Sequence, residues 1–442
     1  MFCRVVANNK TMSKKVVILG AGFAGLQAAR HIKGQGNEVT LIDQYNFHQF
    51  QPLFYQVATA RLEPSAISFP LRKVFQNEQQ LHVRIAKVQE VKLAEKQVFT
   101  TEGTFAFDYL VIATGCTSNF FGNKNFERYA FPMKSTNEAI ALRNRILLNF
   151  EDALSASADE LQEIMNIVVV GGGPTGVELA GSLAEMKTNV LPKDYPDMDL
   201  SGLNIYLVES MPHTLQNMSV PSQTKSQQYL EQMGVKLKLG ALVQDYDGKL
   251  LTLKDGTTIR TRNMIWTAGV MGNVPTGIPQ ELIVKGNRIK VDIYNRLVDH
   301  ECVFAIGDVA YMENIDYPKG HPQLANVAIN QAKNLGRNMK RLAHKQRLQP
   351  FVYKNPGTMA TVGKRKAVVD LPFMSFQGRL AWLTWMFLHL MLILSVRSKL
   401  IIFINWAISY FTNDTTLRLI LLPTRKEIEL TESKPMPAEA GK

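Results

Sequence analysis

A glycine-rich motif occurs twice in this chain, each time between a run of β-branched residues and a helical pattern. The two copies are Gly20-Ala21-Gly22-Phe23-Ala24-Gly25 and Gly171-Gly172-Gly173-Pro174-Thr175-Gly176. Glycines are needed because the backbone must turn tightly and approach a pyrophosphate, whose charge the following helix N-terminus stabilises. One such motif alone is weak evidence. Two copies, each in a strand–turn–helix context, predict two dinucleotide-binding folds.

Each copy continues into a second strand that ends in an acid, at Asp43 and at Glu209. A carboxylate at this place accepts hydrogen bonds from a ribose diol and repels a 2′-phosphate, so Glu209 favours NADH over NADPH. A later strand, 303–308, ends in Gly307-Asp308. An acid there can reach the ribityl chain of a flavin if the polypeptide returns to the first fold. We therefore expect the first fold to bind FAD and the second to bind NADH.

These landmarks predict an α/β protein with two Rossmann-like dinucleotide-binding domains in a glutathione-reductase-like arrangement, plus a C-terminal helical membrane-anchoring module. The predicted parts are a discontinuous FAD-binding domain at 13–125 and 275–350, an NADH-binding domain at 126–274, a C-terminal module at 351–428, and disordered ends at 1–12 and 429–442. Alternating apolar and polar residues indicate a small β-meander at 80–108, and the pattern at 136–155 is typical of a helix.

The cysteines and the charge exclude several other classes of protein. Cys3, Cys116 and Cys302 are far apart, and no Cys-x-x-Cys pair occurs. That pattern excludes a disulfide scaffold, a zinc ribbon and an adjacent redox dithiol, and we expect no metal site. Fifty Lys and Arg against 38 Asp and Glu give a net charge of +12, which suits nucleic acid or an anionic membrane surface. Because zinc-finger spacings and dense basic tracts are missing, nucleic acid is not an expected partner.

The most hydrophobic part of the chain lies near its C-terminus. Leu380 to Val396 holds 17 residues without Asp, Glu, Lys or Arg, and a second apolar run extends from Leu400 to Thr412. Each run is shorter than the roughly 20 residues of a spanning helix. Tryptophans and basic residues beside the runs are typical of a lipid interface. We predict two helices that lie in one leaflet or pack in a dimer seam, with a buried hairpin of a soluble oligomer as the alternative.

Together these motifs resemble those of the type II (alternative, rotenone-insensitive) NADH:quinone oxidoreductases, within the flavoproteins that have two dinucleotide-binding domains. The resemblance runs from about Lys14 to about Leu422. One motif that carries it is Phe47-His48-Gln49-Phe50-Gln51-Pro52-Leu53-Phe54-Tyr55-Gln56-Val57-Ala58, whose family-specific part runs from His48 to Leu53. Further support comes from Trp266-Thr267-Ala268-Gly269-Val270 and Ala305-Ile306-Gly307-Asp308. The resemblance implies an enzyme that does not pump protons. It would oxidise NADH by hydride transfer to FAD and reduce a membrane quinone, either ubiquinone or menaquinone.

Carried over residue by residue, the resemblance implies three groups of site residues. The FAD contacts are Gly20, Ala21, Gly22, Phe23, Ala24, Gly25, Asp43, Gln44, His48, Val88, Thr114, Gly115, Asp308 and Ala325. The NADH contacts are Gly171, Gly173, Gly176, Glu178, Glu209, Ala268 and Gly269. The quinone contacts are Gln51, Pro52, Asn326, Asn330 and Gln331. The family's quinone element, Ala-Gln-x-Ala-x-Gln, has asparagine at 326 and 330 here. An asparagine amide reaches about 1.5 Å less than a glutamine amide, which bears on quinone preference and affinity.

Glu178 is the candidate catalytic residue. From its spacing alone it is a helix-start carboxylate that the helix dipole favours. The resemblance instead places it between the nicotinamide and quinone pockets, where it would contact the nicotinamide ribose and relay protons. His48 has no metal or nucleophile partner nearby in the sequence, and the resemblance makes it a cofactor contact, not a general base.

Two alternatives remain open at this point. A sulfide:quinone oxidoreductase would need a cysteine pair such as Cys116 and Cys302, but buried small hydrophobic residues are the simpler interpretation, and Glu209 argues for NADH. The other alternative is an NADH-sensing flavoprotein interaction module with poor quinone turnover. A disulfide reductase is excluded because residues 46–60 contain no cysteine. We expect a homodimer, peripheral (monotopic) on a membrane with anionic lipids, at the cytoplasmic face of the inner membrane if the protein is bacterial.

Overall fold

The computed structural model describes residues 13–412 and 417–422. These residues form two compact units. The first unit contains the described residues up to Phe50, Ser68–Gly122 and Gly269–Gly357, and the second contains Gln51–Ile67, Asn123–Ala268 and the described residues from Thr358 onward. The predicted boundaries of the nucleotide-binding domains and the C-terminal module remain predictions. The segments predicted to be disordered, 1–12 and 429–442, lie outside the described residues.

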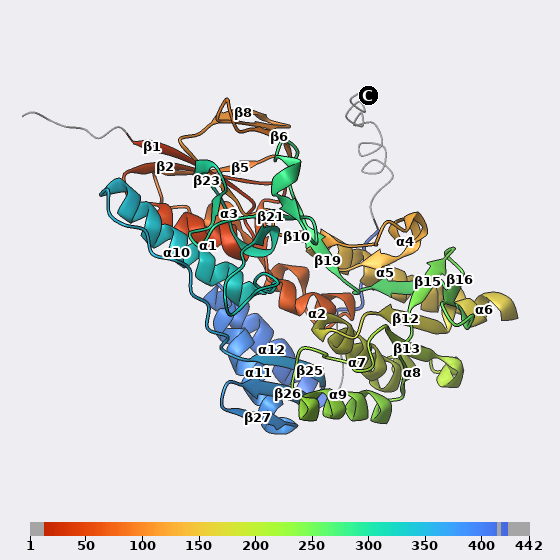
Figure 1. Ribbon diagram of the computed structural model, residues 1–442. Coiled ribbons are helices and arrows are strands. Elements are labelled where there is room, and N and C mark those ends of the chain that lie inside the picture. Colours follow the sequence, from red (N-terminus) through yellow and green to blue (C-terminus); the bar gives the residue numbers. More distant parts are fainter. Residues whose placement is uncertain (1–12, 413–416, 423–442) are drawn as a thin grey trace, which may run out of the picture. The chain divides into compact units, whose positions relative to one another are not determined.

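The first unit is built on a six-stranded sheet (Figure 1). Its strands, in spatial order, are β22 (Arg296–Leu297), β23 (His300–Ala305), β9 (Tyr109–Ile112), β1 (Lys14–Leu19), β2 (Asn37–Asp43) and β5 (Leu81–Ile85). All neighbours pair in parallel except β22, which is antiparallel to β23. Val16, Ile18 and Leu19 of β1 are completely buried, as expected for a central parallel strand whose two faces are covered.

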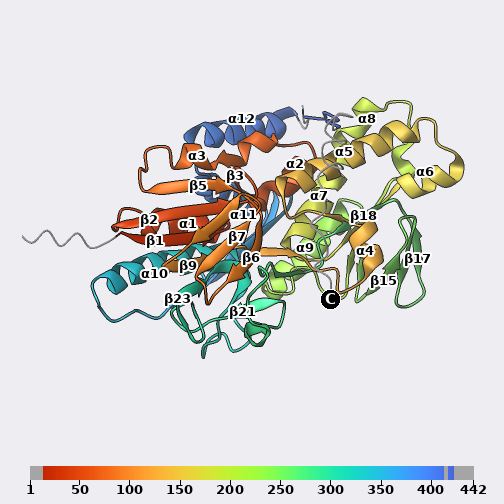
Figure 2. The same cartoon turned by 90° about the horizontal axis from the view of Figure 1, so that it is seen from above.

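Two helices of the first unit lie side by side along this sheet, α1 (Phe23–Ile32) and α10 (Ala325–Ala343), in both Figure 1 and Figure 2. A Cβ atom at Gly336 would overlap the Cβ of His31, so the two helices approach closely there. Other elements of the first unit are the helix α3 (Leu71–Val74), the pair β3 (Phe47–Gln49) with β4 (Ser68–Pro70), the pair β10 (Cys116–Ser118) with β19 (Val270–Gly272), and the sheet β20 (Ile283–Val284), β21 (Arg288–Lys290) and β24 (Ala310–Tyr311).

The meander predicted for 80–108 begins later than expected. Strands β6 (Val88–Lys92), β7 (Gln97–Thr100) and β8 (Gly103–Ala106) form an antiparallel three-stranded sheet. Residues 81–85 instead form β5 at the edge of the parallel sheet. The alternation in β5 arises because Leu81 and Val83 are buried while His82 and Arg84 face solvent, a pattern that an edge strand shares with a meander.

The second unit contains a five-stranded parallel sheet. Its strands, in spatial order, are β11 (Phe131–Pro132), β18 (Asn263–Trp266), β12 (Asn166–Val170), β13 (Asn204–Glu209) and β14 (Val235–Leu239). Its other elements are α2 (Phe54–Ala58), α4 (Lys124–Tyr129), α5 (Thr136–Ala153), α6 (Ala158–Ile164), α7 (Pro174–Asn189), α8 (Leu191–Asp194), α9 (Val220–Gln232), β15 (Val243–Tyr246), β16 (Leu250–Leu253) and β17 (Thr258–Arg260). Helix α5 confirms the helix predicted at 136–155.

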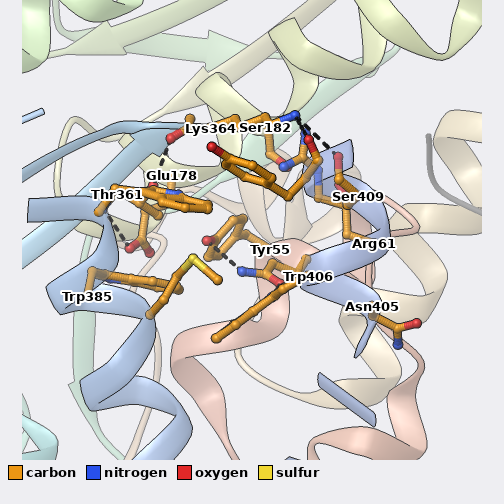
Figure 3. A pocket seen from close by; sticks show the side chains of 15 residues that line it. Tyr55, Arg61, Glu178, Ser182, Thr361, Lys364, Trp385, Asn405, Trp406 and Ser409 are labelled. Atoms are coloured by element: carbon orange, nitrogen blue, oxygen red, sulfur yellow. Dashed lines mark hydrogen bonds between the residues drawn. The ribbon is translucent and has the colours of Figure 1, made fainter. Parts of the chain in front are cut away.

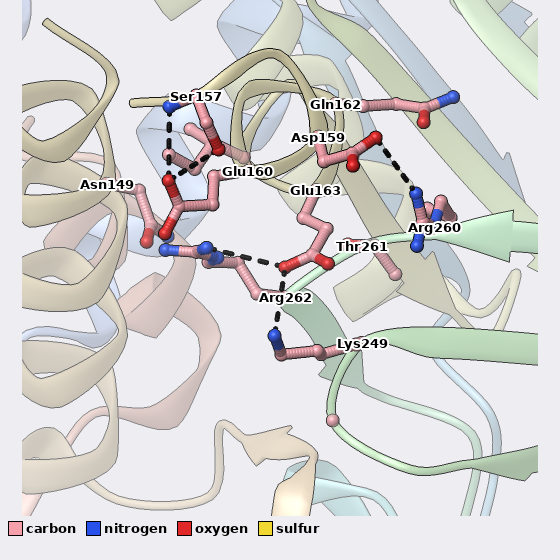
Figure 4. Close-up of polar contacts among 12 residues, drawn as sticks. Asn149, Ser157, Asp159, Glu160, Gln162, Glu163, Lys249, Arg260, Thr261 and Arg262 are labelled. Carbon is pink, nitrogen blue, oxygen red and sulfur yellow. Dashed lines mark hydrogen bonds and ion pairs between the residues drawn. The ribbon is translucent and has the colours of Figure 1, made fainter. Parts of the chain in front are cut away.

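Polar contacts attach α6 to the sheet beside it (Figure 4). Ser157 and Glu160 form a capping box at the start of the helix, which satisfies two backbone N–H groups. At the other end, the buried carboxylate of Glu163 pairs with Arg262 at 3.3 Å and with Lys249 at 4.0 Å. Since each of these charged groups has a partner, we assign the cluster a structural role.

The C-terminal part of the second unit is a small sheet followed by two helices. These elements are β25 (Thr358–Gly363), β26 (Lys366–Leu371), β27 (Met374–Gln377), α11 (Arg379–Leu392) and α12 (Val396–Thr412). Strand β25 packs directly on α7 at Gly181, where a Cβ atom would overlap the carbonyl oxygen of Val362. Trp385 of α11 and Ile402 of α12 are buried. Among the described residues, no helix has the length and apolar character needed to cross a membrane.

Candidate active site

The first glycine turn follows β1 and leads into α1. Asp43, at the end of β2, accepts hydrogen bonds from the backbone N–H groups of Ala21 at 2.6 Å and Tyr45 at 2.8 Å. Burial raises the pKa of Asp43, while these backbone N–H groups lower it. Around the Cβ positions of Gly22 and Gly115, no described atom lies within 4 Å. An open backbone at a helix N-terminus, with an acid behind it, fits the pyrophosphate and ribose of FAD.

His48 is held behind the same turn. Its Nδ1 donates to the carbonyl oxygen of Ala21 at 2.8 Å, and its ring lies edge-on to Phe23 with 5.2 Å between the centroids. Burial lowers the pKa of His48 to about 4, although the bond to Ala21 acts in the opposite direction. The ring is therefore neutral near pH 7, with Nε2 as an acceptor. His48 positions the glycine turn, and its contact with FAD remains a prediction.

Asp308 lies in the short turn η5 (Gly307–Val309), where Cys116 Sγ donates to its Oδ2 at 3.0 Å. The backbone N–H of Gly307 donates to Oε1 of Gln331 at 2.7 Å, and Gln331 is 1% exposed. Gln331 thus supports the turn from α10. Cys302 is in β23, packed against the hydrophobic core, and neither Cys116 nor Cys302 forms a disulfide within the described residues.

The other residues predicted to bind FAD lie at the ends of elements of the first unit. Thr114 follows β9, and its Oγ1 donates to the carbonyl oxygen of Asn273 at 2.6 Å. Gln44 follows β2, Val88 begins β6 and Ala325 begins α10. Their contacts with FAD remain predictions.

The second glycine turn repeats the hydrogen bonds of the first. Glu209, at the end of β13, accepts the backbone N–H of Gly172 at 2.5 Å and that of Met211 at 2.8 Å. Gly173 caps α7, and Ala268 follows β18, within 2.8 Å of the Cβ position of Gly171. Apart from Glu178, the residues predicted to bind NADH in this unit lie around this turn, and their contacts with NADH remain predictions. Gly269 belongs to the first unit.

A pocket of the second unit lies beside α7 (Figure 3). It is lined by Tyr55, Gln56, Arg61, Glu178, Ser182, Thr361, Gly363, Lys364, Trp382, Trp385, Met386, Asn405, Trp406, Ser409 and Tyr410. These residues come from α2 and the segment after it, from α7, and from the C-terminal elements β25, α11 and α12. The space measures about 590 Å³, including the part that opens to solvent.

Glu178 lies in this pocket, on the second turn of α7. Its side chain is 8% exposed, and Oε1 accepts the backbone N–H of Thr361 at 3.4 Å. Burial raises the pKa of Glu178 to about 8, although the N–H groups of Thr361 and Trp385 lower it. The carboxyl group is therefore largely protonated at neutral pH and can donate or accept a hydrogen bond.

One further side chain brings an unused hydrogen-bond donor to the pocket. Within the part of the chain that the structure describes, Nδ2 of Asn405 is buried without an acceptor. The indole N–H of Trp385 instead interacts with the Glu178 carboxyl and lowers its pKa. Because buried polar groups nearly always have a partner, the unused amide N–H favours a ligand that carries acceptor atoms.

A charged cluster connects several of the elements that line the pocket. Arg61 forms an ion pair with Glu185 of α7, and Glu185 also accepts the backbone N–H of Lys364. The Lys364 ammonium donates to the carbonyl oxygen of Tyr410 and lies 4.8 Å from the centre of the Tyr410 ring. These contacts connect the segment after α2 to α7, β25 and α12.

None of the five residues predicted to contact a quinone lines this pocket. Gln51 is exposed and Pro52 half-buried in η1 (Gln51–Leu53) of the second unit. Asn326, Asn330 and Gln331 lie on α10 of the first unit, where Asn330 Nδ2 donates to the carbonyl oxygen of Asn326 at 2.8 Å. Their contacts with a quinone therefore remain predictions.

Sequence reasoning identified Glu178 but missed most of the pocket around it. The otherwise apolar helix α12 carries a polar stripe at helical spacing, formed by Ser398, Asn405, Ser409 and Thr412. Asn405 and Ser409 line the pocket and Ser398 is buried, so much of this stripe faces protein. A polar stripe on an otherwise apolar helix was thus the available signal for a binding site.

Two glycine turns, each backed by an acid at the end of the next strand, define a pyridine nucleotide oxidoreductase with two dinucleotide-binding folds. The chain matches the family "Pyridine nucleotide-disulphide oxidoreductase" over residues 14–332 and the "NDH2 C-terminal domain" over residues 356–413. It is 32% identical to the type II NADH:quinone oxidoreductase Ndh of Mycobacterium tuberculosis over 415 residues, which is 90% of this chain and 88% of that protein. The chain belongs to the family of the type II NADH:quinone oxidoreductases.

Solved structures share the fold. NDH2 from Plasmodium falciparum in complex with NADH superposes with a TM-score of 0.85 at 20% identity, covering 91% of this chain and all of that one. The sulfide:quinone oxidoreductase of Aquifex aeolicus has a TM-score of 0.66 at 16% identity, covering 91% and 96%. The predicted family and fold class are confirmed. The likeness to the sulfide enzyme is one of fold alone.

Proposed function

We propose that this protein oxidises NADH and reduces a quinone, with FAD held at the first glycine turn, NADH at the second, and the quinone headgroup in the pocket beside Glu178. Membership of the type II family supports the reaction, and the matching geometry of the two turns supports the two nucleotide sites. When bound, FAD supplies the two-electron chemistry that links NADH to the quinone. The protein's own residues bind, orient and exclude water.

One observation supports the pocket assignment most strongly, namely the excess of hydrogen-bond donors over acceptors. Asn405 offers a buried N–H group with no acceptor among the described residues, and Glu178 is protonated below a pH of about 8. A quinone headgroup has two carbonyl oxygens, which only accept, and an apolar ring that suits Trp385 and Trp406. The donor set and the ligand are therefore complementary.

The test is steady-state NADH oxidation by the purified protein with short-chain ubiquinone and menaquinone analogues, with the flavin identified after extraction. Asn405→Leu removes the amide at similar volume, so the KM for quinone should rise roughly tenfold, the worth of about one hydrogen bond, while the KM for NADH stays unchanged. Asn355→Leu, at an exposed position, is the matched control. If NADH bleaches the flavin absorbance of the native protein but the protein reduces no quinone, the proposed reaction is wrong.

We also propose that α11 and α12 bind the surface of a membrane with anionic lipids. Their exposed apolar side chains are Leu380, Leu383, Phe387, Leu388, Met391, Leu392, Val396, Leu400, Phe403, Ile404, Ile408 and Phe411. Arg365 and Arg379 line a second hollow between these helices, which shares Trp382, Met386, Trp406 and Tyr410 with the pocket. A lipid-soluble quinone could then enter the pocket from the apolar side. The predicted homodimer and the cytoplasmic face remain predictions.

The membrane proposal is tested by co-sedimentation with vesicles of neutral and of anionic lipid. Replacing Phe387, Phe403 and Phe411 by serine should lower binding at least tenfold, because three exposed aromatic rings are lost. Ile315→Ser changes another exposed apolar residue, which is 99% exposed, and should have no effect. Unchanged vesicle binding of the triple variant, combined with a monomer in place of a dimer on a sizing column, would assign the face to a dimer seam instead.

A further inference from the structure

Three buried side chains form a directed chain of hydrogen bonds at the pocket (Figure 3). Trp406 Nε1 donates to Gln56 Oε1 at 2.8 Å, and Gln56 Nε2 donates to the hydroxyl oxygen of Tyr55 at 2.8 Å. Tyr55 and Gln56 are each 5% exposed, and Trp406 is 9% exposed. These hydrogen bonds connect α12 to α2, and Trp406 and Gln56 are 350 residues apart in the sequence.

The direction of these bonds follows from chemistry. An indole N–H can only donate, so the Gln56 atom that faces Trp406 must be the amide oxygen. The amide NH₂ group then faces Tyr55, which settles the choice between the two amide orientations. The hydroxyl oxygen of Tyr55 is therefore an acceptor in this bond, and its own proton points elsewhere. Among the described residues, no acceptor receives that proton.

Tyr55 is held firmly in this position. Thr59 Oγ1 donates to the backbone carbonyl of Tyr55 at 2.8 Å and also bonds Ser182 Oγ of α7 at 2.8 Å. Burial and the nearby charge of Glu178 raise the pKa of Tyr55 well above its usual range. Tyr55 therefore keeps its proton at any physiological pH. Tyr55 lines the same pocket as Glu178 and Trp385.

We propose that the Tyr55 hydroxyl donates a hydrogen bond to one carbonyl oxygen of the bound quinone, and that Gln56 and Trp406 are positioning residues that keep this donor available. The inference rests on the proposed quinone reduction. Negative charge develops on the carbonyl oxygen as electrons arrive. A donor fixed in advance stabilises that charge more than it stabilises the neutral quinone, and so raises the rate.

The experiment compares Tyr55→Phe, Trp406→Phe and the double variant in the flavin-loaded protein. Tyr55→Phe should lower kcat/KM for a short-chain ubiquinone analogue roughly tenfold to a hundredfold. NADH oxidation with dissolved ferricyanide should not change. Trp406→Phe frees Gln56 to rotate and accept the Tyr55 proton, so it should cause a smaller loss of the same kind. The double variant should be no worse than Tyr55→Phe, because both changes remove one donor.

Binding is measured separately through tryptophan fluorescence, since three of the four tryptophans line the pocket. Quenching of this fluorescence by the quinone gives its Kd. In Tyr55→Phe the Kd should rise by a smaller factor than the turnover rate falls, because the hydrogen bond from Tyr55 strengthens as charge develops on the quinone oxygen. Tyr206→Phe, a half-buried tyrosine of β13, is the matched control and should match the native protein in all assays.

The outcomes separate the two proposals. If the native protein reduces quinone and Tyr55→Phe does so equally well, the hydrogen bond is refuted while the proposed function stands. Additive losses in the double variant would refute the positioning role of Trp406. If the native protein does not reduce quinones at all, both proposals fail together.

Discussion

The two glycine turns of this protein are built in the same way. In the first, Asp43 accepts the N–H of Ala21, and in the second, Glu209 accepts the N–H of Gly172. Each acid also accepts the N–H two residues further on. The same arrangement of an acid and two backbone N–H groups therefore occurs at both turns, and the two acids differ by one methylene group.

The helices after the two turns differ in what their outer faces meet. Gln27 of α1 and Glu178 of α7 occupy equivalent places, seven residues after the first glycine of their motifs. The face of α1 that bears His31 packs against α10, whereas Glu178 is buried in a pocket beneath β25 and α11. The turn sets which class of ligand binds at the helix N-terminus. Whether a further ligand can bind along the helix, as proposed for the quinone beside α7, depends on which elements pack over that helix.

The largest expected effect comes from adding a Cβ atom to either turn. Gly20 has φ +95° and Gly171 has φ +112°, where an L-residue is strained by about 1–3 kcal/mol. The new atom would also overlap the carbonyl oxygen of Ala113, or lie 2.8 Å from Ala268. Gly20→Ala should yield protein without flavin. Gly171→Ala should retain flavin but weaken NADH binding at least a hundredfold. Flavin absorbance and an anaerobic NADH titration measure the two effects.

Gly202→Ala is the control for these glycine variants, because Gly202 has ordinary φ and no described atom within 4 Å of its Cβ position. It should match the native protein. A Gly171→Ala variant that loses flavin and keeps NADH binding would reverse the assignment of the two turns.

The fold and the two turns could be predicted from the sequence because their signals are local. Strand, glycine turn, helix and acidic strand end follow one another within about 40 residues. The pocket could not be predicted, because Gln56 and Trp406 are 350 residues apart in the chain and no local pattern pairs them. Gln331, a motif position predicted to contact a quinone, supports the Gly307 turn, and this structural role has no signal in the local sequence.

The next effect concerns Glu178, which has no counterpart of this kind on α1. Burial raises the pKa of Glu178 from about 4.5 to about 8, so between these pH values this carboxyl group binds more protons in the folded protein than in the unfolded chain. The contribution of Glu178 to stability should therefore fall as pH rises from about 5 to about 8. Glu178→Gln should remove this fall, gaining roughly 2–4 kcal/mol over the native protein at pH 8. Denaturant unfolding at several pH values measures the difference.

Glu63→Gln, at an exposed position, provides the control and should leave the pH dependence unchanged. If native protein and Glu178→Gln lose stability in parallel between pH 5 and 8, the carboxyl group is charged in the folded state, and its role as a donor in the pocket is wrong.

The smallest effect tests the two acids against each other. Glu209→Ser shortens the side chain and removes the negative charge, so a 2′-phosphate is no longer repelled, and the preference for NADH over NADPH should fall about tenfold. The ratio of kcat/KM for the two nucleotides measures it. Asp43→Ser makes the same kind of change at the first turn. It should weaken flavin retention and leave the nucleotide preference untouched, because the acid there faces a different ligand. Equal shifts in preference from the two variants would show that the turns are not divided between FAD and NADH as proposed.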